Sequence, residues 1–184
     1  MPRSRNEPTI SFRISCDPIG FTQKTAAEFF DLLQSAGVRK LVDVRENRVG
    51  QLSGFAKFPD IAYFLDKLLG IPYTHEPLFA PTPEIREQYQ ATKDWDAYER
   101  SFRALMAERE VPQAIDPADY EGSVALLCSE PTAEKCHRRL VGEMLVEHWT
   151  AAGHEAELHH LAMPKAKARR KKNVKDPDGG SDPL

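Results

Sequence analysis

The sequence has no long apolar run and no internal repeat, and it contains only three cysteines. No apolar stretch approaches the roughly 20 residues that cross a bilayer, which argues against a membrane-spanning protein. The segment from Met1 to Thr9 has basic side chains but lacks the apolar part of a secretory signal. These absences predict a cytoplasmic protein without a membrane partner.

Cys16, Cys128 and Cys136 are odd in number and too sparse for a disulfide-rich domain, so we expect reduced thiols. The seven residues between Cys128 and Cys136 do not match the tight spacing of structural zinc knuckles. A phosphatase-type Cys-x5-Arg loop is also absent, because Glu134 occupies the position where the arginine would follow Cys128.

The net charge of −3 is unevenly distributed. From Pro164 onward, seven basic residues accompany three acidic ones, so this tail carries +4 and the remaining chain −7. The tail has almost no apolar residue to bury, which predicts disorder, and a chain of 184 residues favours one ordinary domain. We expect a flexible amino terminus at 1–9, one α/β domain at 10–162 and a disordered basic tail at 163–184.

Hydrophobic periodicity and turn residues predict alternating strands and helices. Thr25 to Glu28 has the spacing of a capping box, and Gly37 and Gly70 are suited to end the first two helices. The segment from Cys16 to Gly20 contains Asp, Pro and Gly, and we interpret it as a loop. We expect strands at 10–15, 38–45, 71–75, 123–128 and 156–161, and helices at 25–36, 60–69, 85–90, 95–109 and 131–152.

The expected fold class is α/β: a single domain with a mostly parallel, open sheet of about four to five strands and helices on both faces. The segment 76–121 interrupts this alternation with a helical insertion. We expect the insertion to form a lid or a wall over a pocket.

Ligands bind at the carboxyl ends of the strands in an open parallel sheet. The side chains expected at these ends are Gly20 after the first strand, Asp43, Arg45 and Arg48 after the second, His75 at the third, and Cys128 and Glu130 at the fourth. The sequence therefore predicts one site built from residues that are far apart in the chain.

Cys136 and His137 are expected within the first two turns of the helix after the fourth strand, whose amino end carries about half a positive charge. Arg138, together with Arg45 and Arg48, would add planar donors suited to a phosphate or carboxylate. A cysteine near a helix amino end and a histidine can become nucleophilic. This part of the sequence predicts an anion-binding pocket with Cys136 as a candidate nucleophile.

Two other interpretations of the cysteines stay open. Cys136 precedes Leu140 by four residues, on the helix stripe that faces the sheet, so Cys136 and also Cys128 can be small buried hydrophobic residues. A metal site could use both cysteines, His137 and His75, but adjacent residues on a helix point about 100° apart, which makes joint ligation by Cys136 and His137 awkward. We therefore predict no metal ligand, and the cofactor is unknown.

Several motifs occur in a characteristic order. Ile19-Gly20-Phe21-Thr22 precedes the first helix, Leu41-Val42-Asp43-Val44-Arg45 lies in the second strand, and Leu127-Cys128-Ser129-Glu130 is followed by Cys136-His137-Arg138. This arrangement resembles the Domain of Unknown Function 488 family over about Ile10 to Leu161. The resemblance implies a small α/β fold and no established reaction, and it points to Cys128, Glu130, Cys136, His137 and Arg138, with Gly20 and Thr22 as binding candidates in the first loop.

The chain departs from the usual pattern of that family in two places. The first loop reads Gly-Phe-Thr where members often have Gly-His-Ser or Gly-Tyr-Ser. After Arg45 the chain reads Glu46-Asn47-Arg48-Val49 where Pro-x-Ser is usual. We therefore expect neither a first-loop histidine nor a serine contact to phosphate in this protein.

Three functions are compatible with these residues. The first is an enzyme acting on a nucleotide, nucleic acid or other anionic substrate, with Glu130 and His137 as acid–base residues and Cys136 as nucleophile. The second is a non-catalytic regulatory module that senses an anion and binds nucleic acid through the basic tail. The third is a metal-binding protein that uses the cysteines and His137.

Overall fold

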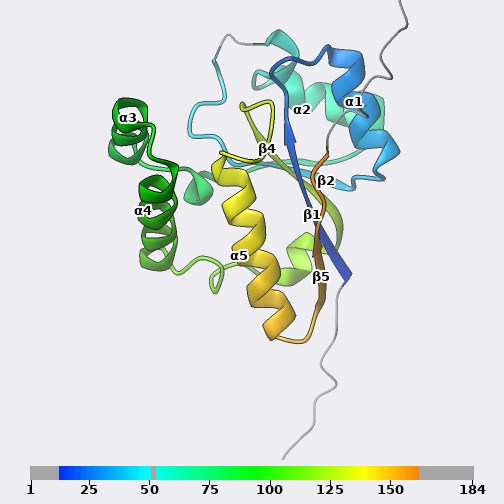
Figure 1. Cartoon of the computed structure of the whole chain (residues 1–184). Coiled ribbons are helices and arrows are strands. Elements are labelled where there is room, and N and C mark those ends of the chain that lie inside the picture. Colours follow the sequence, from blue (N-terminus) through cyan, green and yellow to red (C-terminus); the bar gives the residue numbers. More distant parts are fainter. Residues whose placement is uncertain (1–12, 51–52, 162–184) are drawn as a thin grey trace, which may run out of the picture.

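Five parallel strands form one open sheet in the computed structural model, which describes residues 13–50 and 53–161 (Figure 1). The strands are β1 (Arg13–Gly20), β2 (Lys40–Asp43), β3 (Tyr73–His75), β4 (Gly122–Cys128) and β5 (Glu155–Leu158), in the spatial order β3-β2-β4-β1-β5. All neighbouring strands pair in parallel. The predicted α/β class is therefore confirmed, while the predicted flexible segments at 1–9 and 163–184 lie outside the described residues.

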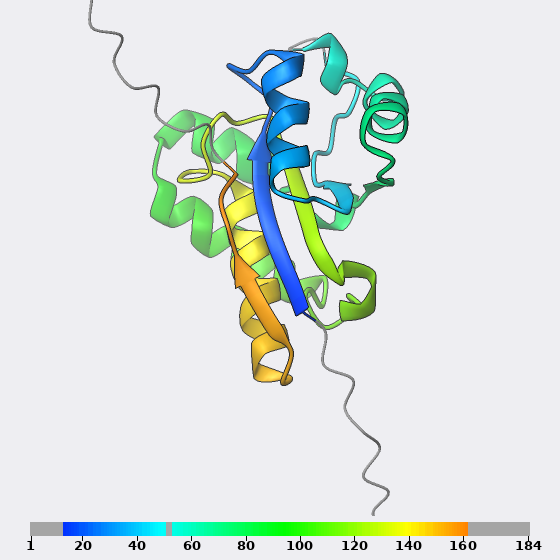
Figure 2. The ribbon, with the colours of Figure 1, turned by 90° about the vertical axis from the view of Figure 1, so that its right-hand side faces the viewer.

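Helices cover both faces of the sheet, and Figure 2 shows α1 in front of the strands and α5 behind them. On one face lie α1 (Ala26–Ser35) and α2 (Asp60–Phe64), which continues as a π-helix over Leu65–Leu69. On the other face lies α5 (His137–Ala151), with α4 (Trp95–Glu108) beside it and α3 (Pro83–Thr92) against α4. Short 3₁₀ segments occur at Gly54–Ala56, Pro77–Phe79 and Pro117–Tyr120.

The central strands β2 and β4 alternate their side chains between two apolar cores, because successive strand residues point to opposite faces. Leu127 belongs to the core under α1 and α2, whereas its neighbour Leu126 belongs to the core under α4 and α5. None of the helices in the described ranges is both long enough and apolar enough to cross a bilayer.

The predicted limits of the first two helices are confirmed. Thr25 Oγ1 accepts a hydrogen bond from the Glu28 amide, and the Glu28 carboxylate accepts one from the Thr25 amide, which is the expected capping box. Gly70 ends the second helix in the left-handed conformation at φ 66°, which favours glycine.

The interpretation of Cys16 to Gly20 as a loop is wrong, because this segment continues β1 and pairs with β4. The Pro18 carbonyl accepts a hydrogen bond from the Leu161 amide, so the backbone of this residue faces the side of β5. The β1–β5 pairing ends at Cys16 and Leu158, so the amide that proline lacks falls beyond the last strand pair.

Asp17 is also accommodated inside β1, although its side chain is buried. The Ser15 hydroxyl donates to one carboxylate oxygen at 2.7 Å, and the Ser123 hydroxyl of β4 donates to the other. A buried carboxylate is tolerated only when it is hydrogen-bonded, and here a neighbouring strand supplies one of the two donors.

The strand register brings the candidate residues to one edge of the sheet. Gly20 pairs with Cys128, and Asp43 pairs with Leu127 on one side and His75 on the other. All these residues lie at the carboxyl ends of their strands. The expected convergence of the strand ends is therefore present.

Candidate functional site

A cavity of about 260 Å³ lies at the carboxyl ends of β2 and β4. The insertion provides one wall through α3 and α4, and the start of α5 provides another. The cavity is lined by Arg45, Glu46, Asn47, Pro81, Arg86, Tyr89, Trp95, Tyr98, Cys128, Ser129, Glu130, Lys135, Cys136 and His137.

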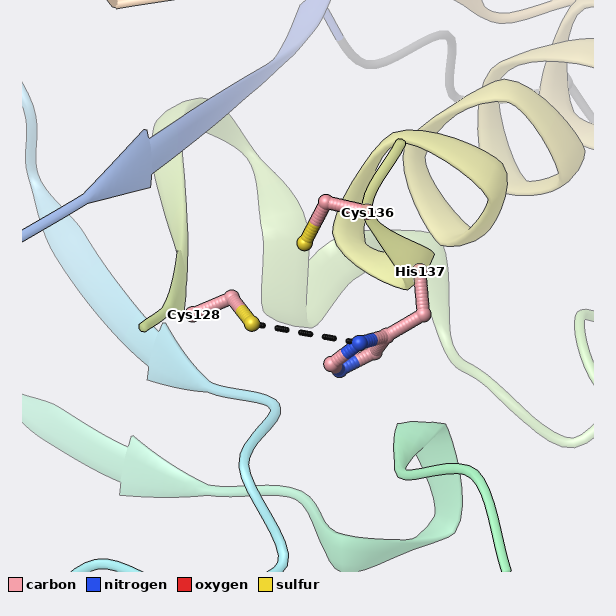
Figure 3. A group of neighbouring side chains, drawn as sticks. All are labelled: Cys128, Cys136 and His137. Carbon is pink, nitrogen blue, oxygen red and sulfur yellow. Dashed lines mark hydrogen bonds between the residues drawn. The ribbon is translucent and has the colours of Figure 1, made fainter. Parts of the chain in front are cut away.

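Cys128 and His137 both line this cavity, and their side chains point toward each other (Figure 3). Cys128 is the last residue of β4, and its Sγ lies 3.8 Å from Nδ1 of His137, the first residue of α5. The other ring nitrogen, Nε2, lies 3.1 Å from the Val44 carbonyl oxygen, which can only accept a hydrogen bond. Nε2 of His137 therefore carries a proton and donates it to that carbonyl, while Nδ1 faces the Cys128 sulfur.

Cys136 completes a cluster with these two side chains. Its Sγ, the Cys128 Sγ and a His137 ring nitrogen all lie within 4.8 Å of one another, and Figure 3 shows the three side chains pointing toward a common centre. The cluster joins the end of β4 to the start of α5, which are separated by eight residues in the chain.

The prediction that the helix starts near Pro131 is wrong, because α5 begins at His137. Cys136 is the N-cap, with extended backbone angles of φ −141° and ψ 138°. The premise that Cys136 and His137 diverge as neighbours on a helix therefore does not hold. The segment before the helix is held in an irregular path by tertiary contacts, since the Thr22 amide donates to the Ser129 carbonyl.

The pKa values of the two thiols shift in opposite directions. A hydrogen bond from Cys136 is the largest cause that lowers the pKa of Cys128, and together with the attraction of His137 it outweighs burial. Burial, followed by the hydrogen bond and negative charge of Cys128, raises the pKa of Cys136. Burial lowers the pKa of His137, but the Cys128 thiolate outweighs it and the net shift is upward. Cys128 is therefore the sulfur that carries negative charge most readily.

Arg138 is a buried cation beside the cluster, with a side chain only 1% exposed. Its Nη1 donates to the Cys136 Sγ at 3.1 Å, and its Nε has no hydrogen-bond partner. Within the described part of the chain, no carboxylate forms an ion pair with it. The Arg138 guanidinium is therefore positioned against the Cys136 sulfur and not against a carboxylate.

Arg45 lines the cavity, but its charge is already paired. Its Nε and Nη2 donate to the two oxygens of Asp43 at 2.8 and 2.6 Å, and Nη2 also donates to the Ala56 carbonyl. The Tyr73 hydroxyl donates to Asp43 as well, and burial, followed by the Asp43 charge, raises the pKa of Tyr73 to about 12. Arg45 and Asp43 thus form a buried ion pair that supports the end of β2.

The other predicted binding residues lie around the cavity and do not line it. Gly20 and Thr22 contact the segment after β4, where the Glu130 carbonyl oxygen would lie only 1.7 Å from a Cβ at Gly20. His75 Nε2 lies 2.8 Å from the Arg45 carbonyl oxygen, and the Arg48 guanidinium lies 4.4 Å from the centre of the Phe58 ring. Five predicted residues line the cavity: Arg45, Cys128, Glu130, Cys136 and His137.

The aromatic wall of the cavity was not predicted from the sequence. Tyr89 of α3 and Trp95 and Tyr98 of α4 line it, and the Trp95 and Tyr98 rings stack at 4.9 Å between centroids with 23° between planes. Arg86 forms an ion pair with Glu46, and both residues line the cavity. The insertion is the wall that we expected, but its aromatic spacing by itself equally fits a core helix.

Alkylation can test the assignment of charge between the thiols. In reduced protein with a chelator at pH 7, iodoacetamide should modify Cys128 at least about tenfold faster than Cys16, because the thiolate is the reactive form. Burial, followed by the Asp17 charge, raises the pKa of Cys16 to about 12, which makes it the internal control. Peptide mass spectrometry reports both rates, and equal rates would contradict the assignment.

The sign of the pH dependence follows from the lowered pKa of Cys128. Its alkylation rate should reach half of its maximum well below the usual pH of about 8.5 for a free thiol. In His137→Gln, where the positive partner is absent, that midpoint should move upward. A midpoint that stays unchanged would mean that His137 does not stabilise the thiolate.

Comparison with protein families finds a match to the family described as Domain of unknown function DUF488, over residues 25–145. The comparisons with curated proteins and with solved structures found no match. The matched region runs from the capping box of α1 into α5 and includes β2, β4 and the Cys128–Cys136–His137 cluster. Since this region covers more than half of the sequence, the chain belongs to the DUF488 family.

Proposed function

We propose that the protein is an enzyme that binds a small anionic substrate with a planar ring, such as a mononucleotide, and acts on it at Cys128 and His137. The observation that carries the proposal is that this thiol–imidazole pair lies in the same cavity as an aromatic wall and cationic side chains. The volume of about 260 Å³ lies slightly below the roughly 300–1,000 Å³ of typical ligand pockets, which limits the substrate to a small molecule.

The aromatic wall supports the planar ring of the substrate. Trp95 and Tyr98 are stacked on each other, and Tyr89 packs against both at 5.7 and 5.2 Å between ring centroids. Side chains already held by their neighbours lose little conformational freedom when a ring stacks on them. Stacking of a nucleic-acid base on one aromatic side chain contributes about 1–3 kcal/mol.

The anionic part of the substrate is supported by Lys135 and the amino end of α5, whereas Arg86 lines the cavity but is already paired with Glu46. Lys135 is exposed and lies one residue before the N-cap Cys136. The α5 helix has 15 residues, and its amino end adds about half a positive charge. Arg45 contributes less than its position suggests, because Asp43 neutralises it.

The reacting groups in this proposal are the Cys128 sulfur, the His137 imidazole and the Glu130 carboxylate. The thiolate is the form of cysteine that acts as a nucleophile or a metal ligand. His137 and Glu130 line the same cavity and are suited to transfer protons to or from the substrate. Cys136 supports the thiolate of Cys128, whereas the sequence alone suggested Cys136 as the nucleophile.

Calorimetry with three related ligands tests the two halves of the proposed binding site. AMP should bind at least about tenfold more tightly than adenosine, which lacks the anion, and than ribose 5-phosphate, which lacks the ring. Trp95→Leu should reduce the affinity for AMP to that for ribose 5-phosphate. Lys135→Gln should weaken the binding of AMP without changing the binding of adenosine. Tyr63→Leu and Lys67→Gln, on exposed residues of the opposite face, are matched controls.

The proposal is contradicted if AMP, adenosine and ribose 5-phosphate bind equally or not at all. A screen of nucleotide hydrolysis and group transfer then tests catalysis. Cys128→Ser should retain the bound AMP but lose at least about 100-fold in turnover. Equal turnover by Cys128→Ser and wild type would contradict catalysis at Cys128 and would support a protein that binds anions without this reactive centre.

A further inference from the structure

The Cys128–Cys136–His137 cluster contains three soft or borderline ligands, whose ligand atoms lie within 4.8 Å of one another. We propose that these side chains bind one borderline-soft divalent transition metal ion, for which zinc is the probe, and that its fourth coordination position faces the cavity. The inference deepens the proposed function, and it rests on that function only for the role of the fourth position.

The distances suit a tetrahedral ion after small side-chain movements. Bond lengths of about 2.3 Å to sulfur and 2.0–2.1 Å to nitrogen require about 3.6 Å between a sulfur and a nitrogen on the same ion. Cys128 Sγ and His137 Nδ1 are 3.8 Å apart, and all three ligand atoms lie within 4.8 Å. The ligand atoms are thus within about 1 Å of the spacing that a tetrahedral zinc ion requires.

The orientation of His137 is that of a metal ligand. Its Nε2 proton is directed to the Val44 carbonyl at 3.1 Å, which leaves the Nδ1 lone pair directed at the sulfurs. Metal-binding histidines commonly donate their second ring N–H to a backbone carbonyl in this way, which sets the tautomer and the ring orientation.

A bound divalent ion would stabilise both cysteines of the cluster as thiolates. Two thiolates and a divalent ion make a centre with no net charge, so its burial is less costly than that of isolated ions. Arg138 donates a hydrogen bond to the Cys136 Sγ, and hydrogen bonds of this kind to a ligand atom tune a metal site. Among the described residues, no carboxylate forms an ion pair with Arg138. When zinc binds, each thiol that is still protonated releases its proton to solvent, and so does Nδ1 of His137 where it is protonated, which balances the charge.

Three protein ligands leave one position of a tetrahedral ion open. Structural zinc sites use four protein ligands, whereas catalytic sites use three and keep the last position for water or substrate. Cys128, Cys136 and His137 all line the cavity together with Glu130, so the open position is accessible to a ligand in it. The bound ion would polarise a substrate oxygen or activate water at that position.

Zinc titration of the reduced full-length protein, stripped with a chelator, tests the site directly. Wild type should bind one zinc ion per chain, with an affinity on the order of 100-fold or more above that of Cys128→Ser, Cys136→Ser and His137→Gln. Cys16→Ala removes the third thiol, which is not part of the cluster, and this variant should bind zinc like wild type. Circular dichroism and thermal melting establish that each variant is folded.

Cobalt titration of the wild type keeps the test valid if a ligand variant fails to fold. Bound cobalt should give a thiolate-to-metal charge-transfer band and the intense visible bands of tetrahedral coordination. Weak octahedral bands alone would overturn the proposal, as would equal zinc affinity of the wild type and the folded ligand variants.

The same samples separate this inference from the proposed function. If the protein stripped of metal binds AMP but does not bind added zinc, the metal inference fails and the proposed binding cavity stands. If zinc binds through the three side chains but AMP binds neither form of the protein, the metal site stands and the proposed substrate class fails.

Discussion

Replacement of Asp43 by asparagine should lower the free energy of unfolding by about 3–5 kcal/mol, because it leaves a buried arginine without its counter-charge. Arg45 is only 7% exposed and Asp43 is fully buried. Asparagine has nearly the same shape, so the loss reports charge and hydrogen bonding more than packing. Urea unfolding of wild type and variant measures the difference.

A double variant distinguishes the lost charge pair from general damage. Asp43→Asn combined with Arg45→Met removes both charges, and it should regain about 1 kcal/mol or more relative to Asp43→Asn alone. Glu155→Gln disrupts the Arg13–Glu155 ion pair, whose side chains are 85% and 69% exposed, and should leave stability within experimental error. Equal losses for Asp43→Asn and Glu155→Gln would show that burial of the pair has no energetic effect.

Replacement of Gly20 by alanine should both destabilise the protein and disrupt the cavity. The added Cβ would lie 1.7 Å from the Glu130 carbonyl oxygen and 2.8 Å from its carbon, so the backbone after β4 must move. Overpacking of this kind typically costs about 1–3 kcal/mol. Because the displaced segment leads to Cys136, zinc affinity should also fall by at least about tenfold.

A matched glycine gives the control for this variant. A Cβ at Gly54 would meet nothing within 4 Å, so Gly54→Ala should change neither stability nor zinc affinity measurably. Thermal melting and zinc titration report the two effects of Gly20→Ala separately. If Gly20→Ala behaves like Gly54→Ala in both, the close approach of the Glu130 carbonyl does not position the site.

Secondary structure was predictable where local chemistry determines it. The capping box at Thr25 and Glu28 and the helix end at Gly70 depend on hydrogen bonds and backbone angles within a few residues. The β4 strand was predictable because its continuous apolar run matches burial on both faces of a parallel sheet. The alternation of such elements was sufficient for the fold class.

Predictions failed where contacts distant in the sequence overrule local preference. Pro18 and Asp17 indicate a loop locally, but the end of the β5 pairing accommodates the proline and Ser123 of β4 satisfies the carboxylate. Pro131 suggests a helix start, but contacts of the following segment with Gly20 and Thr22 delay α5 to His137. In both cases the deciding partner lies on another strand or loop.

The sequence by itself determined the α/β class and predicted the edge of the sheet where a site should form, because strand ends in a parallel sheet must meet. Only the tertiary structure decided how Cys128, Cys136 and His137 face one another. The N-cap backbone of Cys136 turns its sulfur toward Cys128, and the Val44 carbonyl orients His137. Sequence spacing does not specify these directions, since they depend on where α5 begins and on a carbonyl that follows β2.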